Sequence, residues 1–184
     1  MSTRISFNLS VSSVKKAQAA LRKYENNLSA KCRRFTQALA TKGIIVAQQN
    51  TGEYGKYIMF SAETETEKYG ARTILIATNV STIISQWQTR DGMREAEVSP
   101  LLMAEFGAGL RANISNNPTA RELGMGTGSF PGQTHAEDPE GWWYMDMDGE
   151  WHHSYGTYPS MPMWNAANEI IDQIRDTARE VFAT

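Results

Sequence analysis

A stripe of apolar residues near the N-terminus places the strongest constraint on the fold. Its members recur at steps of three, four and seven, which puts them on one face of an α-helix. We therefore predict one amphipathic helix over 11–49, capped by Ser12 or Ser13, that continues through Gly43. The alternative at its end is a short strand at 44–46. So long a helix exceeds what a small core requires, so part of it is expected to project or to line an interface. The stripe consists of Val14, Ala17, Leu21, Tyr24, Leu28, Phe35 and Leu39.

Charge is distributed unevenly along the chain. Residues 11–42 hold eight Lys or Arg and one Glu, a net charge of +7, whereas residues 43–184 hold nine basic and nineteen acidic residues, a net charge of −10. Such segregation suits an acidic partner, another copy of the chain or a nucleic-acid backbone. The overall acidity and the lack of aromatic residues among the basic ones favour a protein partner. Transient contact of the basic helix with DNA stays open.

The region 57–106 is expected to form a small sheet and a short helix. Residues 79–89 fit either a helix or a strand. Further along, Pro100 fits the first position of a short apolar helix, with Ser99 as its cap and Gly107 ending it. The segments predicted as strands are 57–64 and 73–78.

Glycine and proline punctuate residues 107–140, which we predict to be a long loop insertion. The chain then reaches a final helix over 162–183. The residues expected on its core-facing side are Ala166, Ile170, Ile174, Ala178 and Val181.

An aromatic segment over 141–158 predicts a β-hairpin. Asp148-Gly149 lies between two alternating runs, and a two-residue hairpin turn needs positive φ at both positions. The hairpin carries more large apolar side chains than one face of a two-stranded ribbon can bury. This surplus predicts a surface that contacts a partner. The side chains concerned are Trp142, Trp143, Tyr144, Met145, Met147, Trp151 and Tyr155.

Together these elements predict an α+β fold in one domain over 1–184. Its small, mostly antiparallel β-sheet is flanked by the long N-terminal helix and the C-terminal helix, with the long Gly-rich loop inserted. No segment approaches the ~20 apolar residues of a membrane helix, and the N-terminus has no apolar core of signal-peptide length. We therefore expect no membrane partner and a protein that acts where it is made. Cys32 is the single cysteine, which excludes an internal disulfide and a cysteine-based zinc site.

The chain lacks the usual patterns of catalysis and cofactor binding. Its histidines, His135, His152 and His153, lie near acidic residues, so a metal-dependent hydrolase is an alternative. On a strand, however, His152 and His153 point to opposite faces and cannot both reach one ion. The glycines of 124–128 lack the lysine of a phosphate-binding loop. We expect no catalytic residue, no cofactor and no metal, and hence no enzyme.

Two short motifs, taken in order with the first helix and the hairpin, give the chain a family resemblance. Ala104-Glu105-Phe106-Gly107 is similar to a Val-Glu-Phe-Gly-Thr-like segment, with Ala108 in place of Thr. Met161-Pro162-Met163-Trp164-Asn165-Ala166-Ala167 is similar to a Pro-x-Pro-Phe-hydrophobic-x-x-Ala-like segment, with Met163 where Phe is common. In these motifs the chain resembles the gene-10-like head–tail joining (tail-completion, neck) proteins of long-tailed bacteriophages. The family's frequent Asp-Thr-Gly-x-Leu segment has only a faint counterpart in Asn50-Thr51-Gly52.

The resemblance implies a non-enzymatic structural protein of the virion neck or tail, assembled in the host cytoplasm. It implies a homo-oligomeric ring next to the head-side connector or stopper and next to the tail terminator or tail tube, with transient contact to phage DNA in the channel. Another neck or tail component, such as a tail terminator, stopper or minor capsid protein, is the alternative. Gly107 is expected to permit a helix-ending backbone, Phe106 to pack, and Glu105 to cap a helix or pair across an interface. The residues expected at interfaces are Glu105, Phe106, Gly107, Trp142, Trp143, Trp151, Met163 and Trp164.

Overall fold

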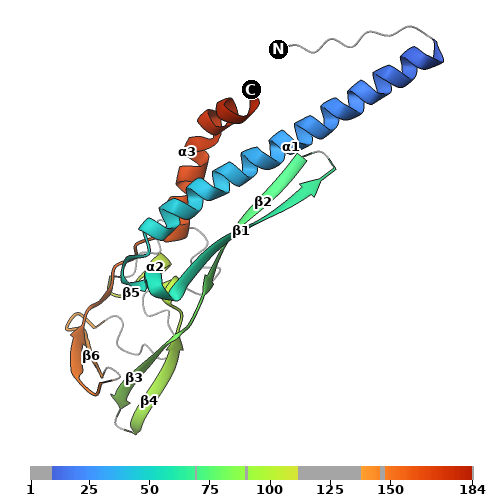
Figure 1. Cartoon of the computed structure of the whole chain (residues 1–184). Helices are drawn as coiled ribbons and strands as arrows, with labels where there is room; N and C mark the ends of the chain where they lie inside the picture. Colours follow the sequence, from blue (N-terminus) through green and yellow to red (C-terminus); the bar gives the residue numbers. More distant parts are fainter. Residues whose placement is uncertain (1–9, 69, 90, 112–137, 146–147, 184) are drawn as a thin grey trace. The chain divides into compact units, whose positions relative to one another are not determined.

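The computed structural model describes residues 10–68, 70–89, 91–111, 138–145 and 148–183. Helices and strands alternate irregularly along the chain (Figure 1). The predicted α+β class, with a long N-terminal helix, small antiparallel sheets and a C-terminal helix, is confirmed. The elements are α1 (Val11–Gln49), the 3-10 helix η1 (Gly52–Tyr57), β1 (Ile58–Glu67), β2 (Gly70–Asn79), β3 (Ile83–Thr89), β4 (Gly92–Val98), α2 (Pro100–Phe106), β5 (Ala108–Gly109), β6 (Trp142–Met145), β7 (Trp151–Ser154), β8 (Gly156–Thr157) and α3 (Pro162–Phe182).

The chain divides into two compact units. The first unit comprises Met1–Thr41, Ala62–Ile74 and Gln173–Thr184, and the second comprises Lys42–Ser61 and Leu75–Asp172. Helices α1 and α3 and strands β1 and β2 each contribute residues to both units. One domain over 1–184 therefore stays a prediction.

Helix α1 covers the predicted range 11–49 without a break. Its cap is Ser10, not Ser12 or Ser13, because the Ser13 N–H donates to Ser10 Oγ at 3.3 Å. Gly43 lies inside the helix, and the alternative of a strand at 44–46 is wrong. A Cβ at Gly43 would lie 2.7 Å from Cδ1 of Ile170, so glycine lets α3 approach α1 closely there.

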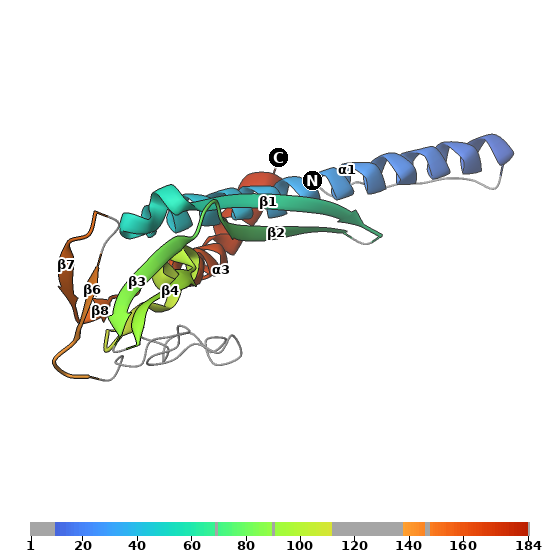
Figure 2. The same cartoon turned by 90° about the horizontal axis from the view of Figure 1, so that it is seen from below.

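In the first unit, the β1–β2 hairpin packs against α1 through threonines. The Oγ1 atoms of Thr64 and Thr73 lie 3.0 Å apart, and Thr73 donates to Oγ1 of Thr36 on α1 at 2.9 Å. The rings of Phe35 and Phe182, with centroids 5.7 Å apart, join α1 to the end of α3. In both views α1 runs alongside the hairpin, and its N-terminal turns extend past the hairpin's end (Figures 1 and 2). The N-terminal part of α1 thus extends beyond these contacts.

The second unit contains a four-stranded antiparallel sheet in the order β4-β3-β6-β7. Strands β3 and β4 pair from Ile83↔Val98 to Thr89↔Gly92, so the ambiguous residues 79–89 form a strand over most of their length. A second, two-stranded sheet pairs β5 with β8. Its partners, Ala108↔Thr157 and Gly109↔Gly156, bring distant parts of the chain together.

The start of α2 agrees with the prediction. Pro100 occupies its first turn, and Oγ of Ser99 accepts the Leu102 N–H at 3.3 Å. The structure adds a second cap, because Oδ1 of Asn79 accepts the Leu101 N–H at 3.0 Å. Two first-turn amides that would lack a helical partner are therefore satisfied. The α2 helix supplies Ala104 and Phe106 to the cores of the unit.

Candidate interaction surface

Strands β6 and β7 form the predicted aromatic hairpin, with Trp143 opposite His153 and Met145 opposite Trp151. Its turn differs from the prediction. Met145 pairs with Trp151, which leaves an odd number of residues between the strands, and Gly149 has positive φ, at 83°. A two-residue turn at Asp148-Gly149 would require an even number, so this register excludes it; residues 146 and 147 lie outside the described residues.

One face of this hairpin lies against the rest of the second unit. Neighbouring residues of a strand point to opposite faces, so Trp142 and Trp143 are separated. A Cβ at Gly109 would lie 2.4 Å from Cη2 of Trp142, which shows that the indole ring rests on the β5 backbone. Trp142 therefore makes an internal contact, and its place at an interface stays a prediction.

The other face of the hairpin is exposed. Trp143 and Trp151 are 61% and 48% accessible to solvent. The His153 ring lies between Trp143 and Tyr155, with centroid distances of 4.8 and 4.7 Å. We call this the aromatic face; it consists of Trp143, Trp151, His153, Tyr155, Tyr158 and Arg111.

Arg111 extends the aromatic face beyond the hairpin. Its Cζ atom lies 4.7 Å from the ring centroid of Tyr158 and 5.8 Å from that of Tyr155, within reach of cation–π attraction. Its Nη1 donates to the carbonyl of Gly156 at 3.4 Å. No pattern in the sequence marks Arg111, because this residue follows β5 and is brought to the tyrosines by the β5–β8 pairing.

The composition of the aromatic face indicates what it can bind. Trp, Tyr and Arg are the residues that most often anchor protein–protein contacts, since they bury a large area and still offer a polar atom. His152 and His153 are neighbours on β7, so their side chains point to opposite faces and cannot both reach one ion; His135 lies outside the described residues. Within the described ranges, no three His, Cys, Asp or Glu side chains are grouped to hold a metal ion.

The two motifs that carry the family resemblance contact each other. Glu105 is buried at the end of α2, and its carboxylate accepts the N–H groups of Met163 and Trp164 at 2.8 and 3.0 Å. These amides belong to the first turn of α3 and have no partner inside that helix. A carboxylate also interacts favourably with the helix dipole at this end. Glu105 therefore caps α3 within the chain.

Backbone contacts fix the same junction. The carbonyl of Ala104 accepts the N–H groups of Ser160 and Met161 at 2.8 and 3.0 Å. Gly107 ends α2 with φ 73° and ψ −169°, and a Cβ there would lie 2.4 Å from the carbonyl oxygen of Thr157. We call residues 104–107 and 159–167 the interlocked motifs.

The weakest part of the resemblance, Asn50-Thr51-Gly52, lies at the same place. Nδ2 of Asn165 donates to Oδ1 of Asn50 at 3.2 Å and to the carbonyl of Ser160 at 3.0 Å. Three segments that are far apart in the sequence thus meet around the start of α3.

Besides Trp142, the predicted interface residues fall into two groups. Glu105, Phe106 and Gly107 are buried in the second unit, and Met163 and Trp164 are half-buried beside Glu105. Their internal contacts are architectural, and an interface role for them stays a prediction. Trp143 and Trp151 are the predicted interface residues that the structure exposes.

Comparison of the chain with protein-family models, with curated proteins and with solved structures gives no match. Across the described ranges, no helix has the length and apolar character needed to cross a membrane. The aromatic face and the interlocked motifs are therefore the observations that bear on function.

Proposed function

We propose that the protein is a structural component of a bacteriophage neck, where it forms a ring that joins the DNA-filled head to the tail. The observation that carries this proposal is the aromatic face. Its exposed Trp143 and Trp151 stand on a hairpin whose opposite face is seated on β5 through Trp142. A preorganised set of large side chains loses little conformational entropy on binding, so it suits a permanent contact with a neighbouring protein.

The interlocked motifs support the proposed family relationship. Each motif is short, so their contact in space is a second observation beside their order in the sequence. Here the buried Glu105 of the first motif caps the helix that the second motif opens, and Asn165 of the second contacts Asn50. If members of the family share the cap that Glu105 provides for α3, the two motifs should occur together in their sequences.

The aromatic face fits the head-side connector or stopper, or the tail terminator or tube, as the neighbour. A tail terminator, a stopper or a minor capsid protein could present the same kind of surface, because fold does not fix position in a stack. These alternatives differ in which junction fails when the protein is absent.

Gene deletion in the virus that carries the gene tests the proposal. We expect DNA-filled heads and complete tails that stay separate in electron micrographs, and wild-type protein supplied in trans should restore joining. A Trp143→Ala/Trp151→Ala variant should restore infectious particles about 100-fold less well, because two aromatic anchors typically contribute more than 2 kcal/mol to a contact.

A matched control is Met59→Ala/Val80→Ala, which also removes two exposed apolar side chains but lies outside the aromatic face. It should complement as well as the wild type. Normally joined particles after deletion would overturn the neck role, and full complementation by the double tryptophan variant would overturn the role of the aromatic face.

A further inference from the structure

Helix α1 exposes part of its apolar stripe. Leu21 and Tyr24 are 54% and Leu28 is 42% accessible, although Ala17 and Leu39 of the same stripe are buried and Phe35 is half-buried. The spacing of three and four between the exposed residues is that of a helix seam which packs on a partner. We call Leu21, Tyr24 and Leu28 the α1 stripe.

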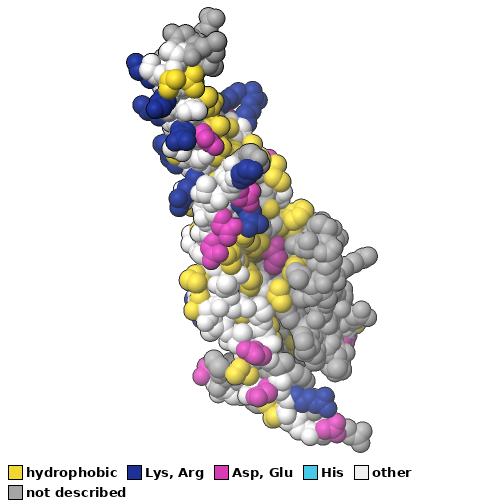
Figure 3. All heavy atoms as spheres, turned by 90° about the vertical axis from the view of Figure 1, so that its right-hand side faces the viewer, with side chains coloured by type: hydrophobic (Ala, Val, Ile, Leu, Met, Phe, Trp, Pro, Cys, Tyr) yellow, Lys and Arg dark blue, Asp and Glu magenta, His cyan; other side chains and the backbone are white. Residues whose placement is uncertain are grey.

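Basic side chains surround the α1 stripe. Figure 3 shows Lys and Arg gathered along this part of the molecule. None of those between residues 15 and 34 forms an ion pair with a described residue. The stripe therefore lies in a strongly positive surface. The residues are Lys15, Lys16, Arg22, Lys23, Lys31, Arg33 and Arg34.

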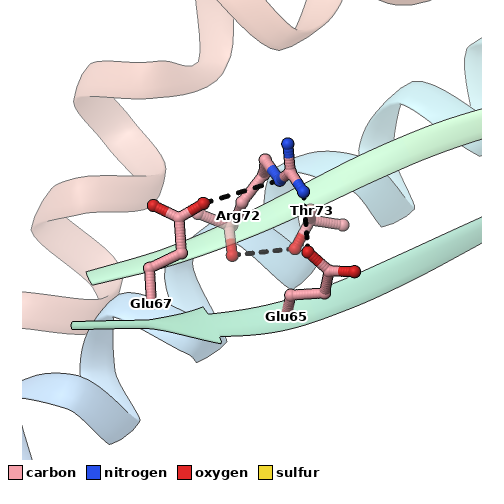
Figure 4. Close-up of polar contacts among 5 residues, drawn as sticks. Glu65, Glu67, Arg72 and Thr73 are labelled. Atoms are coloured by element: carbon pink, nitrogen blue, oxygen red, sulfur yellow. Dashed lines mark hydrogen bonds and ion pairs between the residues drawn. The ribbon is translucent and has the colours of Figure 1, made fainter. Parts of the chain in front are cut away.

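The β1–β2 hairpin of the same unit presents the opposite charge. Thr64 and Thr73 face α1, so by strand alternation Glu63, Glu65 and Glu67 lie on the outer face. Nη2 of Arg72 lies 2.7 Å from Glu65, and Nε of Arg72 lies 3.6 Å from Glu67 (Figure 4).

This local pairing leaves the outer face negative. The hydrogen bond from Arg72 to Glu65, and then the charges of Glu65 and Glu67, raise the pKa of Arg72, so the guanidinium stays charged. One cation among three carboxylates gives a negative balance, and Glu63 makes no ion pair with a described residue. Ile74, which follows Arg72 by two positions, is 42% exposed on the same side. We call Glu63, Glu65, Glu67 and Ile74 the acidic face.

We infer that the α1 stripe of one copy binds the acidic face of a second copy. The inference rests on the proposed function, since it supplies the contact between like subunits of the ring. The two faces are complementary in charge, and each includes exposed apolar side chains. Because they are different surfaces of one unit, a heterologous contact that repeats from copy to copy is available, as a ring requires. Pairing of α1 with another α1 would instead oppose like charges.

The dimensions of the two faces agree. Leu21 and Leu28 are about 10 Å apart along a helix, and Glu63 and Glu67 are about 13 Å apart along a strand. One helix on one hairpin buries less than the roughly 800 Å² per partner of a stable interface. Isolated pairs should therefore be weak, and closure of the ring should strengthen them.

Duplex DNA is the competing occupant of the basic helix. Contacts to DNA phosphates are made by cationic and polar groups, and exposed leucines add nothing to them. Here the exposed Leu21 and Leu28 lie among the cationic side chains. The combination of apolar and basic side chains therefore favours the protein partner.

Charge reversal tests the contact in sedimentation-velocity experiments on the full chain. Arg22→Glu/Lys23→Glu should weaken self-association at least about tenfold, because it lowers the net charge of residues 15–34 from +6 to +2. Glu63→Lys/Glu67→Lys should do the same, because the net charge of Glu63, Glu65, Glu67 and Arg72 changes from −2 to +2. The four substitutions in one chain should associate more strongly than Glu63→Lys/Glu67→Lys alone, because they remove most of the positive charge on α1 that the reversed hairpin repels. An equimolar mixture of the two double variants should also associate. Circular dichroism checks that each variant is folded.

The control is Arg175→Glu/Arg179→Glu, which changes the net charge equally on exposed positions of α3. It should leave association unchanged. The inference is overturned if the wild type stays monomeric at high concentration, if the α1 reversal associates normally, or if the fourfold variant fails to recover. Loss of duplex DNA binding without loss of association in the α1 variant would also overturn it, in favour of the nucleic acid. If the fourfold variant recovers association but gene deletion leaves particles joined, the contact between copies is supported and the neck role is overturned.

Discussion

Replacing Gly107 with alanine should strongly destabilise the second unit. At φ 73° and ψ −169° the backbone is in a region that costs other residues about 1–3 kcal/mol. The new Cβ would also lie 2.4 Å from the carbonyl oxygen of Thr157 and 2.9 Å from Cδ of Pro159. Neither atom can rotate away, because one is backbone and the other is in a proline ring. The total loss should exceed about 4 kcal/mol, a large part of the 5–15 kcal/mol that stabilises a typical domain.

Comparison with Gly52→Ala separates the cost of the left-handed backbone from the cost of the steric clash. Gly52 also has positive φ, at 58°, but a Cβ there would meet nothing within 4 Å. Its free energy of unfolding should fall by only about 1–2 kcal/mol, the cost of the left-handed backbone alone. Urea unfolding followed by circular dichroism measures both variants. Equal losses would mean that the close approach of β8 and Pro159 to Gly107 does not matter.

The second large effect is expected for Glu105→Ala. Removing the carboxylate leaves the amides of Met163 and Trp164 without their acceptor at a half-buried helix start. Hydrogen bonds to a charged group contribute about 1.5–3 kcal/mol each, and unpaired buried donors add a further cost. The free energy of unfolding should therefore decrease by about 3–4 kcal/mol. Hydrogen exchange at Met163 and Trp164 should accelerate more than exchange in the middle of α3.

Two further variants define the role of Glu105. Glu105→Gln keeps one acceptor oxygen of similar shape, so it should lose roughly half as much stability as the alanine variant. The exposed Glu53 sits in the first turn of η1 and provides the control, since Glu53→Ala should change stability by less than about 0.5 kcal/mol. A Glu105→Ala protein as stable as the control would contradict the capping assignment.

Local signals were sufficient to predict several parts of this fold. The α1 helix follows from apolar periodicity, and Gly43 does not interrupt it. The absence of a side chain at Gly43 leaves the space in which Ile170 packs. The start of α2 follows from Ser99-Pro100, and the hairpin follows from two aromatic runs on either side of Asp148-Gly149. In each case the residues that decide the structure are neighbours in the sequence.

The remainder depends on contacts between distant residues. Periodicity placed Ile174 on the covered side of α3, whereas the structure exposes Ile174 and buries Thr177, because neighbouring elements select the covered side. Alternation separated Trp142 from Trp143 but could not tell which one faces inward, since Gly109 decides that from another part of the chain. The partners of Glu105 lie 58 and 59 positions away, so the capping contact could be suspected but not located.

The pairing of β5 with β8 has a consequence for how such chains can diversify. Gly109 and Gly156 lie opposite each other, so the chain between them starts and ends at one place. Its described strands also belong to the unit, because β6 pairs with β3 and Trp142 rests on Gly109. The outward-facing Trp143 and Trp151 take no part in these contacts. Such positions can be exchanged, by evolution or by design, while the capped start of α3 is preserved, so a descendant could acquire a different docking neighbour without rebuilding the body that carries it.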